Sequence, residues 1–329
     1  MIKVGLIGIG GISDAHISAY RKLDNLKVVA AADVLGHKAM HAADVAALGA
    51  KIYTDADEML ENEELDMLDV MVPTFVHREM IEKGLSRGLH VLSEKPMART
   101  SADCSEIVKK AAENKRLCMI AHCVRFDNPY LCLRTLVESG ELGKPIHFIL
   151  NRIGSVPRWS VNDWMQDGEL SGGVPLDLSI HDIDFIYSVF GEPRDISAAY
   201  RPFTGKDPNG LNEFISANLI YDGFCATVTG SQYNTDIRFG AEFFAVFENG
   251  TLDYRGGKLL KCGKEVTPED IIPEADGFAL PLISMYGREI AYFADCIENG
   301  RKPDFVTLES SEGTVKLVER IVAAAKVIK

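Results

Sequence analysis

The sequence has no run of lysines and arginines, and its acidic residues outnumber its basic ones, so the formal net charge is −13 at pH 7. A surface of that sign repels polyanions, which argues against nucleic acid as a partner. The chain also lacks any stretch that approaches the roughly 18 uninterrupted apolar residues of a membrane-spanning helix. We therefore expect no nucleic-acid partner and no membrane partner.

The seven cysteines form no CxxC pair and no Cys/His cluster with the spacing of a zinc finger. Their odd number and scatter are typical of reduced thiols in a cytosolic protein. The run VGLIGIGGI near the N-terminus has no small-residue cleavage site behind it, so we expect no signal peptide. Five histidines lack metal-type spacing, namely His16, His37, His41, His90 and His147. The sequence thus predicts a cytoplasmic protein and implies no metal ion.

A length of 329 residues predicts two domains of about 150 residues each. Over residues 1–122, short apolar runs alternate with helical patterns. The predicted strands are 2–8, 27–33, 65–72, 90–94 and 116–121, and the predicted helices are 13–23, 37–48, 55–62, 76–87 and 101–114. This alternation favours right-handed βαβ crossovers, and hence a doubly wound parallel sheet of the Rossmann type.

From about residue 123 the alternation stops and apolar residues recur at every second position. The strands with this pattern are 214–221, 224–232 and a hairpin over 241–254 whose turn is Asn249-Gly250. We expect residues 123–308 to form an α+β domain with a largely antiparallel open sheet, which binds substrate and forms a subunit interface. A helix over about 309–329 is expected to pack back on the first domain.

The turn GIGGIS, residues 8–13, follows the first strand and opens a helix with Ser13 as its expected N-cap. Gly8 permits a tight turn, and Gly10 lets the backbone come close to a pyrophosphate. The free N–H groups at the helix start favour such an anion. We expect this turn to bind a dinucleotide through Gly8, Gly10, Gly11 and Ile12.

Asp33 ends the second predicted strand. A carboxylate at this place can accept hydrogen bonds from both ribose hydroxyls and repels a 2′-phosphate. No arginine follows at residues 34–36 that would bind such a phosphate. The sequence therefore predicts NAD in preference to NADP.

In an open parallel sheet, ligands bind beyond the carboxyl ends of the strands. The segments VPTFVH (72–77) and SEKPMA (93–98) follow two of these strands. We expect cofactor contacts from Pro73, Thr74, His77, Glu94 and Lys95. A lysine at a strand end, beside an acid and before a proline, indicates a functional role, although pairing with Glu94 to fix the loop is the alternative.

The segment LDLSIHDID, residues 176–184, places Asp177 and His181 beside the apolar stripe of a predicted helix. Oxidation of an alcohol needs a base for the hydroxyl proton, and a histidine titrates near neutral pH. A lysine ammonium such as Lys95 stabilises developing alkoxide charge. We assign capping, pairing or hydration to Asp182 and Asp184, and no catalytic role.

The segments GIGGIS, VPTFVH, SEKPMA, RFDNPY and GGVPLDLSIHDID occur in this order over essentially the whole chain. Together they resemble the glucose–fructose oxidoreductase, inositol dehydrogenase and rhizopine-catabolism (MocA) family of NAD(P)-dependent oxidoreductases. The resemblance implies that Lys95 contacts nicotinamide and the substrate hydroxyl, that His181 is the general acid/base, and that Asp177 assists it. It also implies a homodimer or homotetramer. Thr74 and Ser179 depart from the family pattern, which often has Asn and Gly there.

We expect a dehydrogenase that transfers a hydride between NAD and a secondary alcohol or ketone of a sugar, cyclitol or sugar derivative. Trp159 and Trp164 suit the C–H face of a polyhydroxylated ring, and Arg125 and Arg152 would suit a carboxylate. With Asp177 and His181 these residues form the expected substrate set. Two alternatives remain, a non-catalytic NAD-binding sensor and a reductase of the same fold that acts on an unrelated carbonyl or C=C bond.

Overall fold

The computed structural model describes residues 1–203, 212–272 and 284–328 of the chain. The chain divides into two compact units, of which the first comprises residues 1–123 and 282–312 and the second 124–281 and 313–329. Within the described residues, no helix has the length and apolar character needed to cross a membrane. Each unit is built around its own sheet.

The first unit contains a six-stranded sheet in the order β3-β2-β1-β4-β5-β6, in which all neighbours are parallel. The strands are β1 (Ile2–Ile7), β2 (Leu26–Ala32), β3 (Lys51–Tyr53), β4 (Met67–Val70), β5 (His90–Glu94) and β6 (Cys118–Ala121). The central strands β1 and β4 are almost entirely buried because helices cover both faces of such a sheet. The doubly wound parallel sheet is therefore confirmed, and its order reverses between β1 and β4.

The helices of this unit are α1 (Ser13–Tyr20), α2 (Ala42–Ala47), α3 (Ala56–Asn62), α4 (His77–Ser86), α5 (Ser101–Asn114) and α10 (Met285–Glu298). Side chains of Asp55, Thr100 and Ser284 cap α3, α5 and α10. The predicted helix 37–48 is instead a 3₁₀ turn, η1 (Gly36–Lys38), followed by the short α2. Strand β3 was not predicted, since only three residues form it.

The predicted N-cap of the first helix is wrong. Ile12 occupies the N-cap position of α1 without a side-chain bond, and Ser13 is the first helical residue. The Ser13 hydroxyl instead donates to the carbonyl oxygen of Gly10 at 2.6 Å. That bond fixes the glycine turn from within and leaves the N–H groups at the start of the helix uncapped by any side chain.

The second unit contains a nine-stranded sheet in the order β14-β13-β12-β11-β7-β10-β9-β8-β15. The strands are β7 (Pro145–Ser155), β8 (Asp195–Arg201), β9 (Glu213–Ile220), β10 (Cys225–Tyr233), β11 (Gly240–Phe247), β12 (Gly250–Arg255), β13 (Lys258–Lys261), β14 (Lys264–Glu265) and β15 (Ala325–Val327). The pairs β7/β10 and β8/β15 are parallel and the others antiparallel, which confirms a mixed, mostly antiparallel sheet. In the predicted hairpin, Phe247 pairs with Gly250, so the turn is Glu248-Asn249, one residue earlier than expected.

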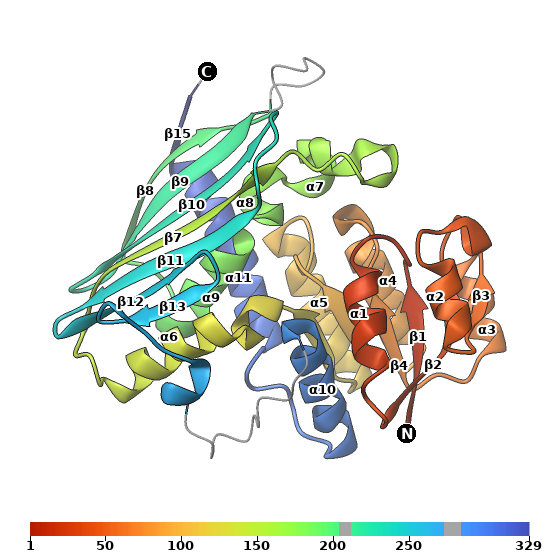
Figure 1. Cartoon of the computed structure of the whole chain (residues 1–329). Coiled ribbons are helices and arrows are strands. Elements are labelled where there is room, and N and C mark those ends of the chain that lie inside the picture. The colour runs from red at the N-terminus through yellow and green to blue at the C-terminus, as the bar shows by residue number, and fades with distance from the viewer. Residues whose placement is uncertain (204–211, 273–283, 329) are drawn as a thin grey trace. The chain divides into compact units, whose positions relative to one another are not determined.

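The two faces of this sheet differ. Inward side chains such as Phe148, Leu150 and Val228 are fully buried, and burial of each contributes about 1.5–3 kcal/mol. Figure 1 shows α8 (Gly173–Asp177) and α9 (Ile180–Phe190) along this covered face. The other face carries exposed Ile149. It also carries a chain of side-chain hydrogen bonds that runs through His147, Thr227, Asn218 and Ser197.

The last two helices, α10 and α11, belong to other units than the expected domain boundaries assign them to. Helix α10, expected in the second domain, belongs to the first unit, where Ile290 and Phe293 are buried. Helix α11 (Leu308–Ala324) was expected to return to the first domain, but its residues from 313 onward lie in the second unit. There Thr314 donates to Asp184 at 2.9 Å, and Gly313 lies against Tyr187, where a side chain on Gly313 would clash.

Candidate functional site

The glycine turn at the end of β1 approaches the end of β4 closely at Gly8 and leaves open space at Gly10. Gly8 has a φ of +85°, and a Cβ atom there would lie 2.6 Å from the carbonyl oxygen of Met71. Glycine at this position is therefore demanded by the close approach of the turn to the end of β4. Around Gly10, by contrast, a Cβ atom would meet nothing within 4 Å. Packing does not require a glycine there, whereas close approach of a phosphate does.

Asp33 follows β2 directly and is held on both carboxylate oxygens. Its Oδ2 accepts from the backbone N–H of Ile9 at 3.0 Å, and its Oδ1 accepts from the N–H of Leu35 at 2.8 Å. The first bond joins the end of β2 to the glycine turn. The carboxylate predicted to recognise ribose thus has a fixed place beside the predicted pyrophosphate site.

The loops after β4 and β5 are tied together by a histidine. The ring nitrogens of His77 lie 2.6 Å from the carbonyl oxygen of Pro96 and 2.9 Å from that of Val72. His77 is 1% exposed, and burial lowers its pKa. Its ring is thus used to join the VPTFVH and SEKPMA segments. Thr74, in the 3₁₀ turn η2 (Thr74–Val76), is also buried.

Glu94 and Lys95 stand at the carboxyl end of β5. Register places Glu94 beside Ala121 of β6, so Lys95 and His122 follow neighbouring strands at the same edge of the sheet. Both oxygens of the Glu94 carboxylate have partners within the chain, since Oε2 accepts from the backbone N–H of Lys95 and Oε1 lies 3.1 Å from Nε2 of His16. Glu94 therefore fixes the turn that carries Lys95.

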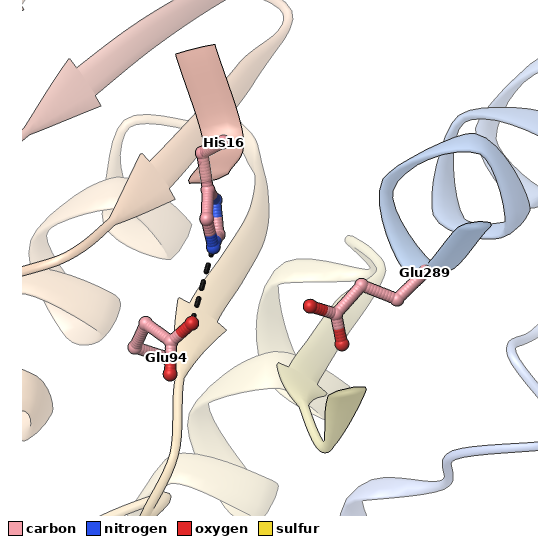
Figure 2. A group of neighbouring side chains, drawn as sticks. All are labelled: His16, Glu94 and Glu289. Atoms are coloured by element: carbon pink, nitrogen blue, oxygen red, sulfur yellow. Dashed lines mark hydrogen bonds and ion pairs between the residues drawn. The ribbon is translucent and has the colours of Figure 1, made fainter. Parts of the chain in front are cut away.

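Beneath this turn lies a buried polar cluster that the sequence did not predict (Figure 2). We call it the His16 cluster, and its members are His16, Tyr20, Asp69, Glu94 and Glu289. The two His16 ring nitrogens lie 2.8 Å from Asp69 Oδ2 and 3.1 Å from Glu94 Oε1. Within the described residues, one atom each of His16, Glu94 and Glu289 lie within 4.8 Å of one another, close enough to share a metal ion. The histidine spacing in the sequence gave no sign of this cluster, because the partners of His16 come from distant parts of the chain.

In the second unit, the predicted single helix through Asp177 and His181 is broken. Asp177 is the last residue of α8 and His181 the second residue of α9, and Leu178 and Ser179 form the joint. Both side chains are partly exposed. The apolar residues Leu176, Ile180 and Ile183 are buried as expected. The break leaves the two polar residues on adjacent short helices at the margin of the core.

Ser179 stands at this joint where the family pattern often has glycine, and the sheet accommodates it. Ser179 is fully buried, and its hydroxyl fills the space that a side chain at Gly230 of β10 would occupy. Glu213 of β9 accepts from the Tyr200 hydroxyl at 2.5 Å and lies against Gly173 of α8. Burial raises the pKa of Glu213 to about 7, and the charge of Asp177 adds to the effect.

The two arginines predicted to bind substrate are occupied by buried aspartates. Arg125 donates from Nε and Nη2 to Asp184 at 2.7 and 2.6 Å. Arg152 donates in the same way to Asp182, both bonds being 3.0 Å, and Tyr130 donates to Asp182 at 2.6 Å. All of these side chains are at most 6% exposed. Of capping, pairing and hydration, the three roles predicted for the two aspartates, the structure shows pairing. The geometry gives no support to the arginines as substrate ligands.

The two tryptophans flank a short segment before α7 (Gly168–Ser171). Trp159 is 58% exposed, and Trp164 lies within the 3₁₀ segment η4 (Val161–Gln166) with partial exposure. The side chain of Arg158 donates to Asn234. An exposed aromatic face at Trp159 is therefore available on this unit, as expected for a residue that packs on a ring.

The residues missed from the sequence lie far apart along the chain. His16, Asp69 and Glu289 come from α1, β4 and α10, so no local spacing relates them. A partial signal existed, because an aspartate within the buried strand β4 requires a polar partner. Glu213 gave no signal, since a single acid at a strand start is ordinary.

The strand order, the glycine turn and the carboxylate after β2 define a dinucleotide-binding protein of the Rossmann class. Residues 2–122 match the family described as "Oxidoreductase family, NAD-binding Rossmann fold", and residues 130–253 match the "GFO/IDH/MocA C-terminal domain". The chain belongs to the GFO/IDH/MocA family of NAD-binding oxidoreductases.

Several relatives match nearly the whole chain. Scyllo-inositol 2-dehydrogenase (NAD(+)) of Bacillus subtilis is 26% identical over 325 residues, which cover 94% of this chain and 90% of the relative. 4-Carboxy-2-hydroxymuconate-6-semialdehyde dehydrogenase of Sphingobium is 31% identical over 307 residues and 92% of each chain. The solved myo-inositol 2-dehydrogenase of Lactobacillus plantarum has a TM-score of 0.79 at 21% identity, over 98% of this chain and 97% of that one. The protein is thus an oxidoreductase of the dehydrogenase type.

Proposed function

We propose that this protein is an NAD-dependent dehydrogenase that transfers a hydride between NAD and a secondary alcohol or ketone of a sugar, cyclitol or sugar derivative. The observation that carries the proposal is family membership combined with the presence of Lys95, Asp177 and His181 at the positions of the family's motifs. Relatives named as inositol dehydrogenases support the class of substrate.

Oxidation of a secondary alcohol removes a hydride from carbon and a proton from oxygen. Bound NAD supplies the hydride acceptor. In this proposal His181 takes the hydroxyl proton and returns it when the ketone is reduced. The ammonium of Lys95 stabilises negative charge on the reacting oxygen, and Asp177 orients the hydroxyl. Partial exposure of Asp177 and His181 supports their access to a substrate.

NAD is the preferred nicotinamide cofactor in this proposal. Asp33 is fixed at the end of β2 by the N–H groups of Ile9 and Leu35, and no arginine stands at residues 34–36. The fixed carboxylate would repel a 2′-phosphate. Gly8, Gly10, Gly11 and Ile12 would hold the pyrophosphate, and Pro73, Thr74 and Lys95 would contact the nicotinamide half.

A neutral polyhydroxylated ring is the favoured substrate. Trp159 offers an exposed aromatic face, and Trp164 belongs to the same segment. Arg125 and Arg152 are neutralised by Asp184 and Asp182, which removes the main argument for a carboxylate on the substrate. An acidic ring remains the second candidate, because the relative in Sphingobium is named for a carboxylated semialdehyde.

The experiment is a fluorescence assay of NADH formation against cyclitols, aldoses, uronates and amino sugars. Turnover of at least one polyhydroxylated ring, abolished in Lys95→Ala and His181→Ala, is the expected result. NADH binding without turnover of any member would favour the sensor alternative. Activity restricted to short aliphatic alcohols or to a C=C bond would replace the proposed substrate class.

We further propose a cytoplasmic homodimer or homotetramer. None of the seven cysteines forms a disulfide, which suits a reducing compartment. The uncovered face of the nine-stranded sheet combines exposed Ile149 with a hydrogen-bonded polar row. Two such faces packed together would bury surface that a monomer leaves in water.

A further inference from the structure

The central residue of the His16 cluster contacts a carboxylate on each side of its ring. Nδ1 lies 2.8 Å from Asp69 Oδ2, Nε2 lies 3.1 Å from Glu94 Oε1, and the His16 side chain is wholly buried. A neutral imidazole has one N–H, so it can donate to only one of these carboxylates. Donation to both requires the imidazolium form. Burial alone lowers the pKa of His16, but Asp69 and Glu94 outweigh it and raise that pKa well above its ordinary value.

The carboxylates on either side of His16 have further donors. Asp69 Oδ2 also accepts from the Tyr20 hydroxyl at 2.8 Å, and Glu94 Oε2 accepts from the backbone N–H of Lys95 at 3.1 Å. Burial raises the pKa of Glu94, but the hydrogen bond and charge of His16 prevail and leave it lowered. One imidazolium therefore lies between two carboxylates, and the group already carries a net negative charge.

Glu289 is the third acid at this place and differs from the other two. It is 0% exposed, and within the described part of the chain neither of its carboxylate oxygens has a hydrogen-bond partner. Figure 2 shows its carboxyl group directed from α10 toward His16 and Glu94. An ionised Glu289 would add a second uncompensated charge in a buried place, whereas a neutral carboxylic acid would not.

Burial raises the pKa of Glu289 well above its ordinary value, and the charge of Glu94 adds to this effect while His16 opposes it. The titratable groups that interact with Glu289 are His16 and Tyr20 of α1, Asp69 of β4, Glu94 of β5 and Tyr286 of α10, with Cys123 beside Tyr286; buried Arg288 precedes Glu289 on the helix. Among the interacting groups His16 is the one that can carry a positive charge, and that charge favours ionisation of Glu289.

We propose that His16, Glu94 and Glu289 form a proton-holding site, with His16 as imidazolium and Glu289 as a neutral acid, and that this site positions Lys95. The site joins α1, which follows the glycine turn, to the end of β5 and to α10. When Glu289 loses its proton, its negative charge repels the carboxylate of Glu94. Because Glu94 Oε2 accepts from the backbone N–H of Lys95, this repulsion displaces Lys95. The proposal that the site positions Lys95 rests on the proposed function, in which Lys95 contacts nicotinamide. The proposed protonation states of His16 and Glu289 do not depend on that function.

The protonation states are tested on the wild-type protein without substrate. Nitrogen-15 NMR of labelled histidine should show His16 with both ring nitrogens protonated at neutral pH. Infrared difference spectra between Glu289→Gln and wild type should show loss of a protonated carboxylic acid band. A neutral His16, or the absence of that band, overturns the proposal even if the dehydrogenase activity is confirmed.

Stability against pH gives an independent test with a matched control. The raised pKa means that folded Glu289 binds a proton that the unfolded chain has lost above about pH 4.5, so wild-type stability falls as pH rises toward the folded pKa. Glu289→Gln cannot lose this proton, and its melting temperature should exceed that of wild type by several degrees at alkaline pH and by little at acid pH. Glu298→Gln, exposed on the same helix, should follow wild type.

The side chains of His16, Glu94 and Glu289 could bind a metal ion instead of protons. Metal binding is measured directly. Mass spectrometry of the purified protein, and melting curves with added Zn²⁺, Mn²⁺ or Mg²⁺, should show no stoichiometric metal and no shift that depends on Glu289. Bound metal that is lost in Glu289→Gln, or a melting temperature lowered by this substitution at every pH, overturns the proposal.

The effect of the site on Lys95 is tested by measuring the affinity for the cofactor. The NADH dissociation constant, followed by fluorescence, should rise several-fold in wild type at alkaline pH and stay level in Glu289→Gln. An identical pH profile in both proteins would leave Glu289 with a purely structural role and overturn the positioning role. Failure of the proposed dehydrogenase activity would show separately, as NADH binding without turnover.

Discussion

Asp33 at the end of β2 accepts a hydrogen bond from the backbone N–H of Ile9 in the glycine turn, at 3.0 Å. The residue that predicts cofactor choice therefore also holds the turn that predicts pyrophosphate binding. The effect of Asp33 on cofactor preference depends on its charge, and its effect on the stability of the turn depends on its acceptor oxygens. Substitutions can therefore separate the two effects.

Replacing Asp33 should narrow the preference for NAD over NADP. Asp33→Asn keeps one acceptor oxygen but removes the charge, so the ratio of the two affinities should fall about tenfold, or about 1.4 kcal/mol. Asp33→Ala removes both and should also lower the melting temperature, since the N–H of Ile9 loses its partner. Calorimetric titration measures both cofactors. Tighter NADP binding by the wild type would contradict the assignment.

Loss of the proposed proton-transfer and charge-stabilising groups should abolish most turnover. Lys95→Ala and His181→Ala should each lower kcat by on the order of a hundredfold or more. Cofactor affinity should change much less in His181→Ala, since that residue is assigned to the substrate. Lys109→Ala, exposed on α5, is the control for the lysine. Steady-state kinetics on the substrate found in the panel measures these effects. Near-normal turnover in His181→Ala would contradict the proposed role of His181 in proton transfer.

Glu213 should make stability depend on pH. Its pKa is raised to about 7 in the folded protein, so the folded state binds more protons than the unfolded state between the ordinary value and about 7. Stability should fall through this range by on the order of 3 kcal/mol and then level off. Glu213→Gln should make the slope over this range shallower and leave the contribution of Glu289, whereas Glu113→Gln, an exposed site on α5, should retain the wild-type slope. Denaturation at several pH values measures the effect, and equal slopes would refute it.

The buried pair Arg125–Asp184 should be far more sensitive than an exposed pair. Asp184→Ala leaves a buried guanidinium without its bidentate partner and should cost about 3–5 kcal/mol of unfolding free energy. Asp222→Ala removes the exposed partner of Arg194 and should cost at most about 1 kcal/mol. Urea denaturation compares them. Similar losses for the two variants would show that burial does not decide the energetics.

A charge placed at the centre of the uncovered sheet face should disrupt assembly. Thr227 lies within the polar row between His147 and Asn218, so Thr227→Arg would place unpaired charge in the proposed interface. Light scattering should show oligomers for wild type and for Ala112→Arg, a control on the exposed side of α5, and smaller species for Thr227→Arg. A wild-type monomer at micromolar concentration would rule out the interface.

The sequence by itself determined the parallel sheet and its cofactor turn, because both depend on local patterns. Apolar runs that alternate with helical periods leave few topologies, and a glycine turn between strand and helix needs only adjacent residues. The predicted start of α1 was wrong because a hydrogen bond that the sequence pattern does not reveal replaced the expected one. The Ser13 hydroxyl bonds to Gly10 instead of capping the helix.

Only the tertiary structure decided which polar side chains are available for ligands. Arg125 and Arg152 suited a carboxylate on the substrate until the fold placed Asp184 and Asp182 against them. His16 had no metal-type spacing to another histidine or cysteine in the sequence, yet α1, β4, β5 and α10 bring it to Asp69, Glu94 and Glu289. Burial raises the energy of an unpaired charge, so such partners are chosen in three dimensions, across separations that no sequence period encodes.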